Sequence, residues 1–161
     1  SEKFAPSEVV DLLNTYFTAM EEAISQYHGV IDKYIGDAIQ IVFYEGPGLE
    51  NTACRACQTA MAMRCKLREL NQERARQGLF ALENGIGIAT GLAISGSIGS
   101  RTGRKDFTII GRVTEQAAHL EARTISTESK ILVCSTTRAA LHSDFALRQH
   151  DAESWELLDE C

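Results

Sequence analysis

Three side chains that can carry charge follow one edge of a predicted helix near the middle of the chain. An alternating strand at 106–110 leads through Gly111 into this helix, so Arg112, Glu115 and His119 fall at positions i, i+3 and i+7. At this spacing Glu115 can form ion pairs with both neighbours. The favoured interpretation is a self-contained charged surface, and the alternative is an active site of altered composition.

A second candidate is the Gly36-Asp37 dipeptide, which stands between two apolar runs within residues 30–43. This pattern predicts a β-hairpin with the dipeptide at its tip. The Asp37 carboxylate is the ligand type that hard divalent cations take. A plain turn is the alternative, because Gly and Asp are common in turns. Lys33, four residues earlier, favours the metal-site interpretation.

Hydrophobic periodicity predicts the framework that positions these residues. The first helix begins near Pro6 and is expected to stop at Gly29. The further elements are a helix at 51–77, a β-rich stretch at 82–94, the strand at 106–110, a helix at 113–123, a strand at 130–134, a short helix at 136–141 and a strand pair within 145–158. Helices mixed with mainly antiparallel strands predict an α+β fold.

The composition of the chain excludes several classes of function. The 161 residues are 44% hydrophobic and 24% charged, which is typical of one soluble domain. A net charge of −6 argues against a nucleic-acid partner. The basic stretch from Arg64 to Arg76 is interleaved with acidic residues and predicts a solvated helix face. No apolar run reaches the roughly 20 residues that span a bilayer, and no signal-peptide pattern is present. The start at Ser1 without Met suggests a fragment.

Five cysteines are scattered along the chain. Cys54-x-x-Cys57 could form a redox pair or half of a zinc site, but no second ligand pair stands at suitable spacing. Helical periodicity places Cys54, Cys57, Met61 and Cys65 near one stripe, so buried core thiols are the favoured interpretation. Reduced thiols fit a cytoplasmic location. His28, His142 and His150 are expected at helix ends or on the surface.

Several ordered motifs carry a resemblance to a known family. The strand at 106–110 with Gly111, Ala117-Ala118 and Leu120-Glu121 resembles the strand–Gly–helix signature of class III nucleotide cyclases. Residues 33–38 are similar to the family's Lys-x-x-Gly-Asp hairpin, 7–17 to its first helix, and 87–91 with 96–100 to its paired Gly-rich motifs. The resemblance covers nearly the whole chain, so residues 1–161 are expected to form a single cyclase-homology domain with a ferredoxin-like antiparallel sheet and packed helices.

The resemblance implies a reaction: the ribose 3′-oxygen of a nucleoside triphosphate attacks the α-phosphorus and pyrophosphate leaves. Two magnesium or manganese ions assist in the family, and Asp37 matches one of the two metal-binding Asp positions. The other belongs to a first strand that is expected upstream of Ser1. Lys33 and Thr108 fall on the base-recognition positions and favour ATP, since a Glu with a Cys suits guanine. An exposed Lys and an ordinary β-branched strand residue remain the alternative.

Two family positions are altered. Where the family has Asn and Arg for the triphosphate, this chain has Glu115 and His119. His119 lacks the permanent donor fork of Arg, and Glu115 puts negative charge beside phosphates. The family builds its site across a dimer, so a homodimer or a heterodimer with another cyclase domain is expected. The hypotheses are therefore a weak or partner-dependent ATP cyclase, or a regulatory pseudo-cyclase; a diguanylate cyclase is disfavoured because its Gly-Gly-Asp/Glu-Glu-Phe loop is lacking.

Overall fold

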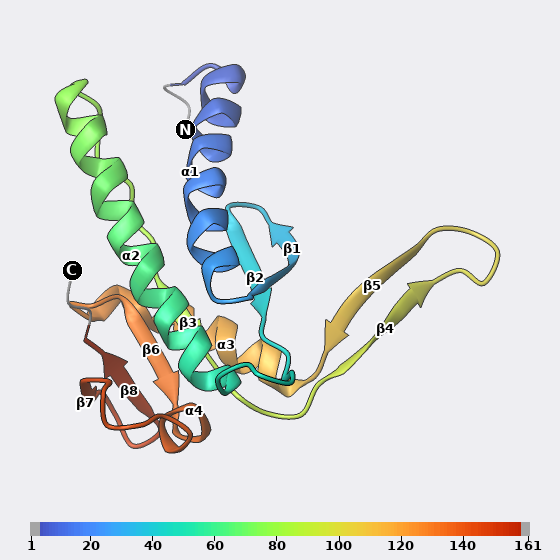
Figure 1. Ribbon diagram of the computed structural model, residues 1–161. Helices are drawn as coiled ribbons and strands as arrows, with labels where there is room; N and C mark the ends of the chain where they lie inside the picture. Colours follow the sequence, from blue (N-terminus) through green and yellow to red (C-terminus); the bar gives the residue numbers. More distant parts are fainter. Residues whose placement is uncertain (1–3, 159–161) are drawn as a thin grey trace.

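The computed structural model describes residues 4–158 as an α+β fold (Figure 1), as expected. Its elements are α1 (Pro6–Gln26), β1 (Val30–Ile35), β2 (Ala38–Val42), α2 (Thr52–Arg76), β3 (Ile86–Ile88), β4 (Ile94–Gly99), β5 (Lys105–Ile110), α3 (Arg112–Arg123), the 3₁₀ turn η1 (Thr124–Ser126), β6 (Ile131–Cys134), α4 (Ser135–Ala139), β7 (Leu147–Gln149) and β8 (Ser154–Leu157). Most predicted elements are thus confirmed, but only 86–88 of the expected β-rich stretch at 82–94 forms a strand before β4. In addition, β4 covers 96–99, where the Gly-rich sequence predicts a flexible connection up to residue 105.

The central sheet has the order β3-β6-β8-β7 and lies between two helices. All four residues of β6 are buried, because alternate side chains meet opposite helices. Ile131 and Val133 pack with Cys57 and Ala60 of α2, whereas Leu132 packs in a second cluster with Leu120 of α3. The sheet therefore fixes α3, and with it positions 112, 115 and 119.

The pairing of β3 with β6 is parallel, while β6–β8 and β7–β8 are antiparallel. Parallel neighbours need a crossover connection, and here the chain between them includes the β4–β5 hairpin and α3. The expectation of a mainly antiparallel sheet holds for β6, β8 and β7. It misses the parallel pair of β3 with β6 at one edge of the sheet.

The N-terminal part packs α1 and the β1–β2 hairpin against α2. Met20, Ile24, Met63 and Leu67 are buried together, and Ile31 and other side chains of the hairpin pack on them. α1 ends at Gln26, and His28 rather than Gly29 takes the left-handed conformation, with φ of 60°. This second core places the hairpin that carries positions 33 and 37.

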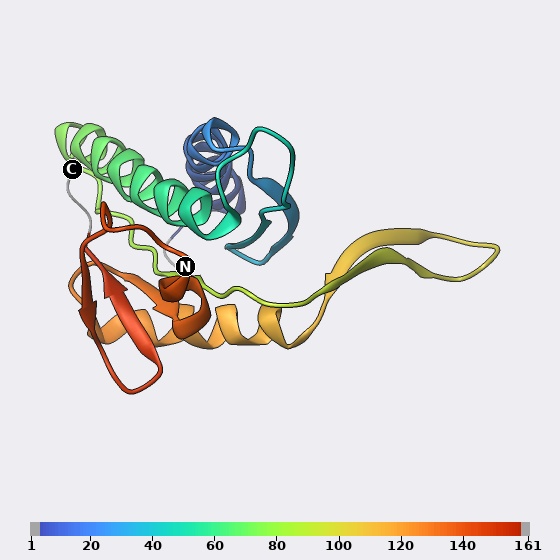
Figure 2. The same ribbon diagram turned by 60° about the horizontal axis from the view of Figure 1, so that its bottom comes forward.

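An arm formed by β4 and β5 (residues 94–110) extends away from the body in both views (Figures 1 and 2). Its strands pair antiparallel from Ile94↔Ile110 to Gly99↔Lys105. Ile94 is 77% exposed and Phe107 62% exposed. Exposed apolar side chains of this kind are typical of interaction surfaces.

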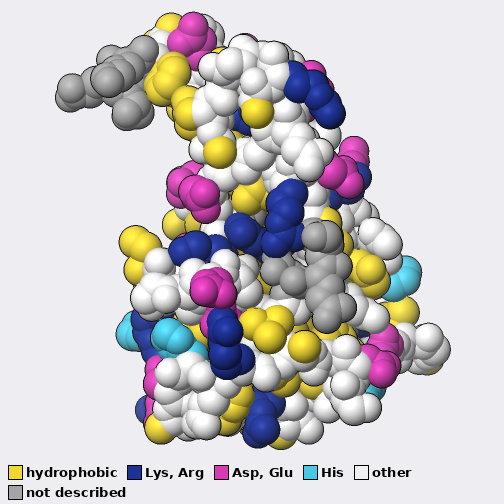
Figure 3. Space-filling model, turned by 90° about the vertical axis from the view of Figure 1, so that its left-hand side faces the viewer, with side chains coloured by type: hydrophobic (Ala, Val, Ile, Leu, Met, Phe, Trp, Pro, Cys, Tyr) yellow, Lys and Arg dark blue, Asp and Glu magenta, His cyan; other side chains and the backbone are white. Residues whose placement is uncertain are grey.

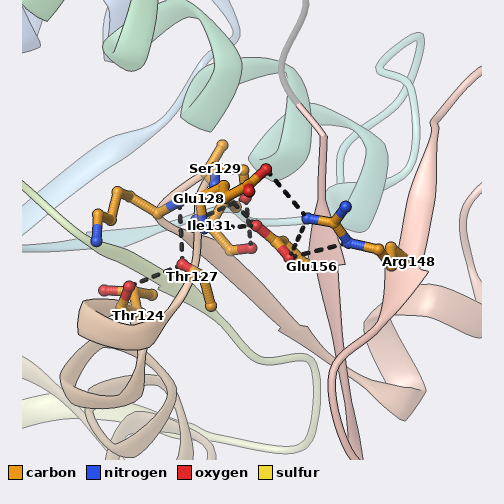
Figure 4. Close-up of polar contacts among 8 residues, drawn as sticks. Thr124, Thr127, Glu128, Ser129, Ile131, Arg148 and Glu156 are labelled. Atoms are coloured by element: carbon orange, nitrogen blue, oxygen red, sulfur yellow. Dashed lines mark hydrogen bonds and ion pairs between the residues drawn. The ribbon is translucent and has the colours of Figure 1, made fainter.

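A buried carboxylate ties β8 to the segment before β6 (Figure 4). Glu156 accepts hydrogen bonds from the backbone N–H groups of Glu128 and Ser129 at 3.0 and 2.8 Å, and Arg148 Nη2 lies 2.9 Å from its Oε2. Burial raises the pKa of the Glu156 carboxyl, but the hydrogen bonds from Ser129 and Arg148 outweigh burial and leave this pKa below its usual value. Glu156 therefore stabilises the sheet in its ionised form.

The surface of α2 is charged with both signs, as expected for the 64–76 stretch. Lys66 lies 3.2 Å from Glu22 and 3.9 Å from Glu69, and Arg76 lies 2.9 Å from Glu73. The side of the molecule in Figure 3 shows Lys and Arg side chains next to Asp and Glu. Among the described helices, none is long and apolar enough to cross a membrane.

The cysteines only partly follow the expectation of reduced core thiols. Cys54, Cys57 and Cys134 are free and buried. Cys65 is only half-buried and is disulfide-bonded. Burial raises the pKa of the Cys57 thiol to about 12, so Cys57 stays protonated and acts as an apolar side chain in the core around α2.

Candidate functional site

Lys33 and Thr108 are in direct contact, although 75 residues separate them in the chain. Lys33 lies on β1 and Thr108 on β5, and Lys33 Nζ donates a hydrogen bond to Thr108 Oγ1. The contact follows from the path of the chain, because the root of the arm passes beside the hairpin. The two positions predicted to read a base therefore form one polar pair.

Asp32 completes this pair and was not predicted from the sequence. The β1–β2 register shifts between Ile31 and Lys33, so Asp32 sits in a β-bulge. Its Oδ2 lies 3.4 Å from Lys33 Nζ and accepts a hydrogen bond of 2.8 Å from Gln40 Nε2. With a side chain 6% exposed, Asp32 holds the ammonium group in place. Its only sequence signal is an acidic residue inside an apolar run.

A shallow hollow of about 330 Å³ lies beside the pair. Asp32 and Phe107 contribute to its lining, together with Val30, Val42 and Tyr44. Lys33 and Thr108 adjoin these lining residues in the chain but do not line the hollow themselves. An apolar wall with a few polar groups at its edge is the usual setting for a flat ring system.

Asp37 stands at the exposed tip of the β1–β2 hairpin, as predicted. Gly36 before it has φ of 61°, a conformation that glycine adopts without strain. Burial raises the pKa of the Tyr16 hydroxyl on α1, and the negative charge of Asp37 adds a smaller upward contribution. The carboxylate is thus open to a cation from solvent.

The helix α3 carries the altered positions, and a close packing contact fixes it on the sheet. A Cβ at Gly87 of β3 would lie 2.1 Å from Ala117 O and 2.4 Å from Glu121 N, so only glycine admits this approach. Glu115 and His119 are exposed on α3. The first glycine of the 87–91 motif is thereby explained as a packing residue.

The expected ion-pair ladder on α3 is not formed. Within residues 4–158, no hydrogen bond or ion pair joins Glu115 to Arg112 or His119. Exposed pairs gain little in water, because side-chain entropy offsets a screened attraction. The prediction of a self-contained charged surface was therefore wrong, and these groups remain available.

In this single chain, then, Lys33 and Thr108 meet, whereas Asp37, Glu115 and His119 make no hydrogen bond or ion pair with that pair in the described residues. The polar pair can discriminate donors and acceptors on a ring. The exposed acidic tip can hold a cation. The face of α3 offers one carboxylate and one imidazole.

Comparison with known proteins identifies the relatives of this chain. The family described as "Adenylate and Guanylate cyclase catalytic domain" matches residues 1–156. An adenylate cyclase of Anabaena cylindrica is 37% identical over 157 residues, which cover 94% of this chain and 30% of the relative. The chain thus spans less than a third of the length of this curated relative.

Solved structures agree in fold. The guanylyl cyclase Cya2 is 32% identical, with a TM-score of 0.78 over 98% of this chain and 84% of that structure. The adenylyl cyclase CyaB from P. aeruginosa is 27% identical, with a TM-score of 0.80 over 99% of this chain and 87% of that structure. One of these relatives is named for guanylyl and the other for adenylyl cyclisation, so overall similarity does not decide the base.

Proposed function

The chain belongs to the family of adenylate and guanylate cyclase catalytic domains. We propose that it converts ATP to cyclic AMP and pyrophosphate, and that its activity is low when no other cyclase domain is present. The observation that carries the choice of ATP is the contact between Lys33 and Thr108. Both residues occupy the positions at which the family reads the base.

The chemistry of this pair favours adenine over guanine. Adenine presents a ring nitrogen that accepts and an amino group that donates on the edge used for base pairing. The Lys33 ammonium can donate to that nitrogen, and the Thr108 hydroxyl can accept from the amino group. Guanine presents the opposite pattern, and an ammonium cannot accept from its ring N–H. The ion pair with Asp32 supports this assignment because it holds the Lys33 ammonium group in a fixed orientation.

Asp37 fits a magnesium or manganese ion in charge, ligand type and exposure. Such ions would lower the pKa of the ribose hydroxyl and neutralise phosphate charge when bound. Asp37 contributes one carboxylate to this site. Its place at the end of a tight hairpin keeps the carboxylate clear of apolar neighbours, so binding a cation needs no rearrangement of the core.

The same arrangement supports a site shared across two chains. Asp37 makes no polar contact with the Lys33–Thr108 pair in the described residues. The exposed apolar side chains of the arm offer a surface for a second cyclase domain. We expect a two-fold dimer, the commonest closed assembly, or a pair with an unlike cyclase domain.

Low turnover is expected because of the side chains at positions 115 and 119 of α3. The phosphate groups need donors that stabilise charge as the bond to pyrophosphate breaks. Glu115 is an acceptor when ionised, and His119 has no bidentate donor fork. The same two residues favour a second candidate function, a regulatory domain that binds ATP without turning it over.

A kinetic experiment separates the two candidates. The purified domain is incubated with ATP or GTP and with magnesium or manganese, alone and mixed with a family domain that supplies intact Asn and Arg positions. A weak ATP cyclase forms cyclic AMP slowly alone and faster in the mixture, with ATP preferred over GTP. A regulatory domain binds an ATP analogue but forms no cyclic AMP alone and adds nothing to the rate of the family domain in the mixture. Equal or better use of GTP would contradict the base assignment.

A further inference from the structure

A cluster of three potential metal ligands lies at the start of α2, among residues that the cyclase reaction does not use. Cys54 Sγ lies 3.2 Å from His142 Nε2, and His142 Nε2 lies 2.7 Å from Glu50 Oε1. One thiol sulfur, one imidazole nitrogen and one carboxylate oxygen thus fall within 4.8 Å of one another. In the part of the chain that the structure describes, no other group of three such residues meets this criterion. We call these residues the Glu50–Cys54–His142 cluster.

Two distant segments are tied together to form the cluster. Asn51 caps α2 by accepting from the Cys54 N–H at 2.8 Å, and its Nδ2 donates to the Ala140 carbonyl at 2.9 Å. Arg55 Nε donates to the Glu50 carbonyl at 2.9 Å. These bonds fix the backbone on both sides, so the ligand atoms are positioned by the fold rather than by the cluster itself.

The cluster is open to solvent on one side only. Cys54 is 0% exposed and forms the floor. The side chains of Glu50 and His142 are 39% and 48% exposed and form the rim. A cation can therefore enter from water, and a fourth ligand position faces solvent. The burial of Cys54 argues against a catalytic thiol, which must be reached by a substrate.

We propose that the Glu50–Cys54–His142 cluster binds a zinc ion through Cys54 Sγ, His142 Nε2 and Glu50 Oε1, with water in the fourth position. Thiolate, imidazole and carboxylate are the three ligand types of tetrahedral zinc. Metal–ligand bonds of about 2.0–2.3 Å put neighbouring ligand atoms roughly 3.3–3.7 Å apart in a tetrahedron. The observed 3.2 and 2.7 Å are shorter, so these two pairs must move apart to admit the metal, and the third pair, Cys54 Sγ and Glu50 Oε1, lies within 4.8 Å.

Asp144 supports the same assignment. Its Oδ2 lies 3.8 Å from His142 Nδ1, on the ring nitrogen that faces away from the cluster. This distance is longer than a hydrogen bond, but a small rotation of the exposed Asp144 side chain would bring it to the distance at which a carboxylate orients a zinc-binding imidazole. Cys57, by contrast, packs in the apolar core. The Cys54-x-x-Cys57 spacing is therefore not a ligand pair, and the partners of Cys54 come from other parts of the chain.

The competing explanation is a plain ion pair, in which a protonated His142 bridges Glu50 and Asp144 and Cys54 is a bystander. The two explanations differ in what Cys54 does. Zinc binding requires the thiolate and releases a proton. An ion pair does not change when the thiol is removed.

Metal binding to the purified, chelator-treated domain tests the proposal. We expect one zinc ion per chain by competition with a chromophoric chelator, and a thiolate-to-metal charge-transfer band when cobalt(II) replaces zinc. The His142→Ala and Cys54→Ala variants should each weaken zinc binding at least about tenfold and lose the cobalt band, and Asp144→Asn should weaken it about tenfold as an outer-shell change. The Cys57→Ala and His150→Ala variants should bind as the parent does.

Folding is checked separately, because Cys54 is buried. His142 is half exposed, so its replacement leaves the core intact, and zinc should raise the melting temperature of the parent but not that of His142→Ala. The proposal is overturned if the parent binds no zinc, if His142→Ala binds it as tightly, or if Cys57→Ala loses binding as Cys54→Ala does.

Discussion

The two ends of the candidate nucleotide site differ in how their side chains are held. At the base end, Lys33 contacts both Thr108 and Asp32, and Asp32 is itself held by Gln40. At the phosphate end, Glu115 and His119 are exposed on α3 and make no hydrogen bond or ion pair in the described part of the chain. The base end is organised within one chain, and the phosphate end is not.

This difference separates binding from turnover. Groups that are already positioned recognise a ligand without paying for their own ordering. Catalysis needs donors aimed at charge that develops only in the transition state. The helix that should carry such donors is rigidly placed by the close approach at Gly87. The change therefore lies in the side-chain types on α3 and not in its position.

The largest expected effect concerns turnover. As a homodimer, the chain should form cyclic AMP at least about a thousandfold more slowly than a family domain with Asn and Arg, by analogy with the loss of an arginine finger. The double variant Glu115→Asn with His119→Arg should recover much of that difference. Initial rates of the parent and of the double variant, each alone with magnesium and with manganese, measure it.

Each single variant and the matched change Glu121→Asn, on the same helix, serve as controls. If the parent already turns ATP over at the rate of an intact family member, the phosphate end is functional as it stands and Arg112 or another group supplies the charge. A double variant without any gain would place the defect elsewhere in the site.

The next effect concerns base choice. The double variant Lys33→Glu with Thr108→Cys should shift relative affinity from ATP analogues toward GTP analogues by about tenfold to a hundredfold, the magnitude of hydrogen bonds to charged groups. Calorimetric titration of both analogues measures this. Lys105→Glu on the arm alters charge without touching the pair. If this double variant and the parent show the same relative affinity for the ATP and GTP analogues, the base end is not the site of recognition.

The arm provides a smaller test, because it asks whether the two ends belong to different chains. Ile98→Asp introduces a charge at an exposed apolar position of β4 and should weaken dimerisation at least about tenfold, since a buried unpaired charge is costly. Sedimentation over a range of concentrations measures it. Ile125→Asp, an exposed change outside the arm, is the control. A parent that stays monomeric at high micromolar concentration would refute the shared site.

Local patterns predicted most of the framework. The 3.6-residue period gave α1, α2 and α3, and the Gly36-Asp37 turn gave the hairpin with its exposed tip. Pairing between distant strands was harder. The parallel contact of β3 with β6 depends on the chain path through the arm and α3, which no local window contains.

The site was predicted where single residues carry a motif and missed where contacts are non-local. Lys33 and Thr108 were expected together, but Asp32 enters through a β-bulge that alternation does not reveal. His142 was expected to be a plain surface group, yet it meets Cys54 from 88 residues away. The stop of α1 was misplaced by one residue. A Cβ at Gly29 would lie 2.8 Å from Ile24 Cγ2, so this glycine serves packing while His28 makes the turn.

The smallest expected effect concerns the stability of the central sheet on which α3 packs. The comparison of the two ends depends on this sheet, because it fixes the position of α3. Glu156→Gln should lower the free energy of unfolding by about 1–3 kcal/mol, because the backbone donors of Glu128 and Ser129 and the Arg148 guanidinium lose their ionised acceptor. The folded-state pKa of Glu156 is lowered, so its stabilisation is complete above the unfolded value of about 4.3 and disappears as pH falls through the folded value. Urea denaturation of parent and variant should therefore differ at pH 7 and converge in acid, whereas the exposed change Glu153→Gln should alter stability by no more than about 0.5 kcal/mol. If the difference in free energy of unfolding between parent and variant persisted unchanged in acid, packing rather than the charge of Glu156 would stabilise the sheet.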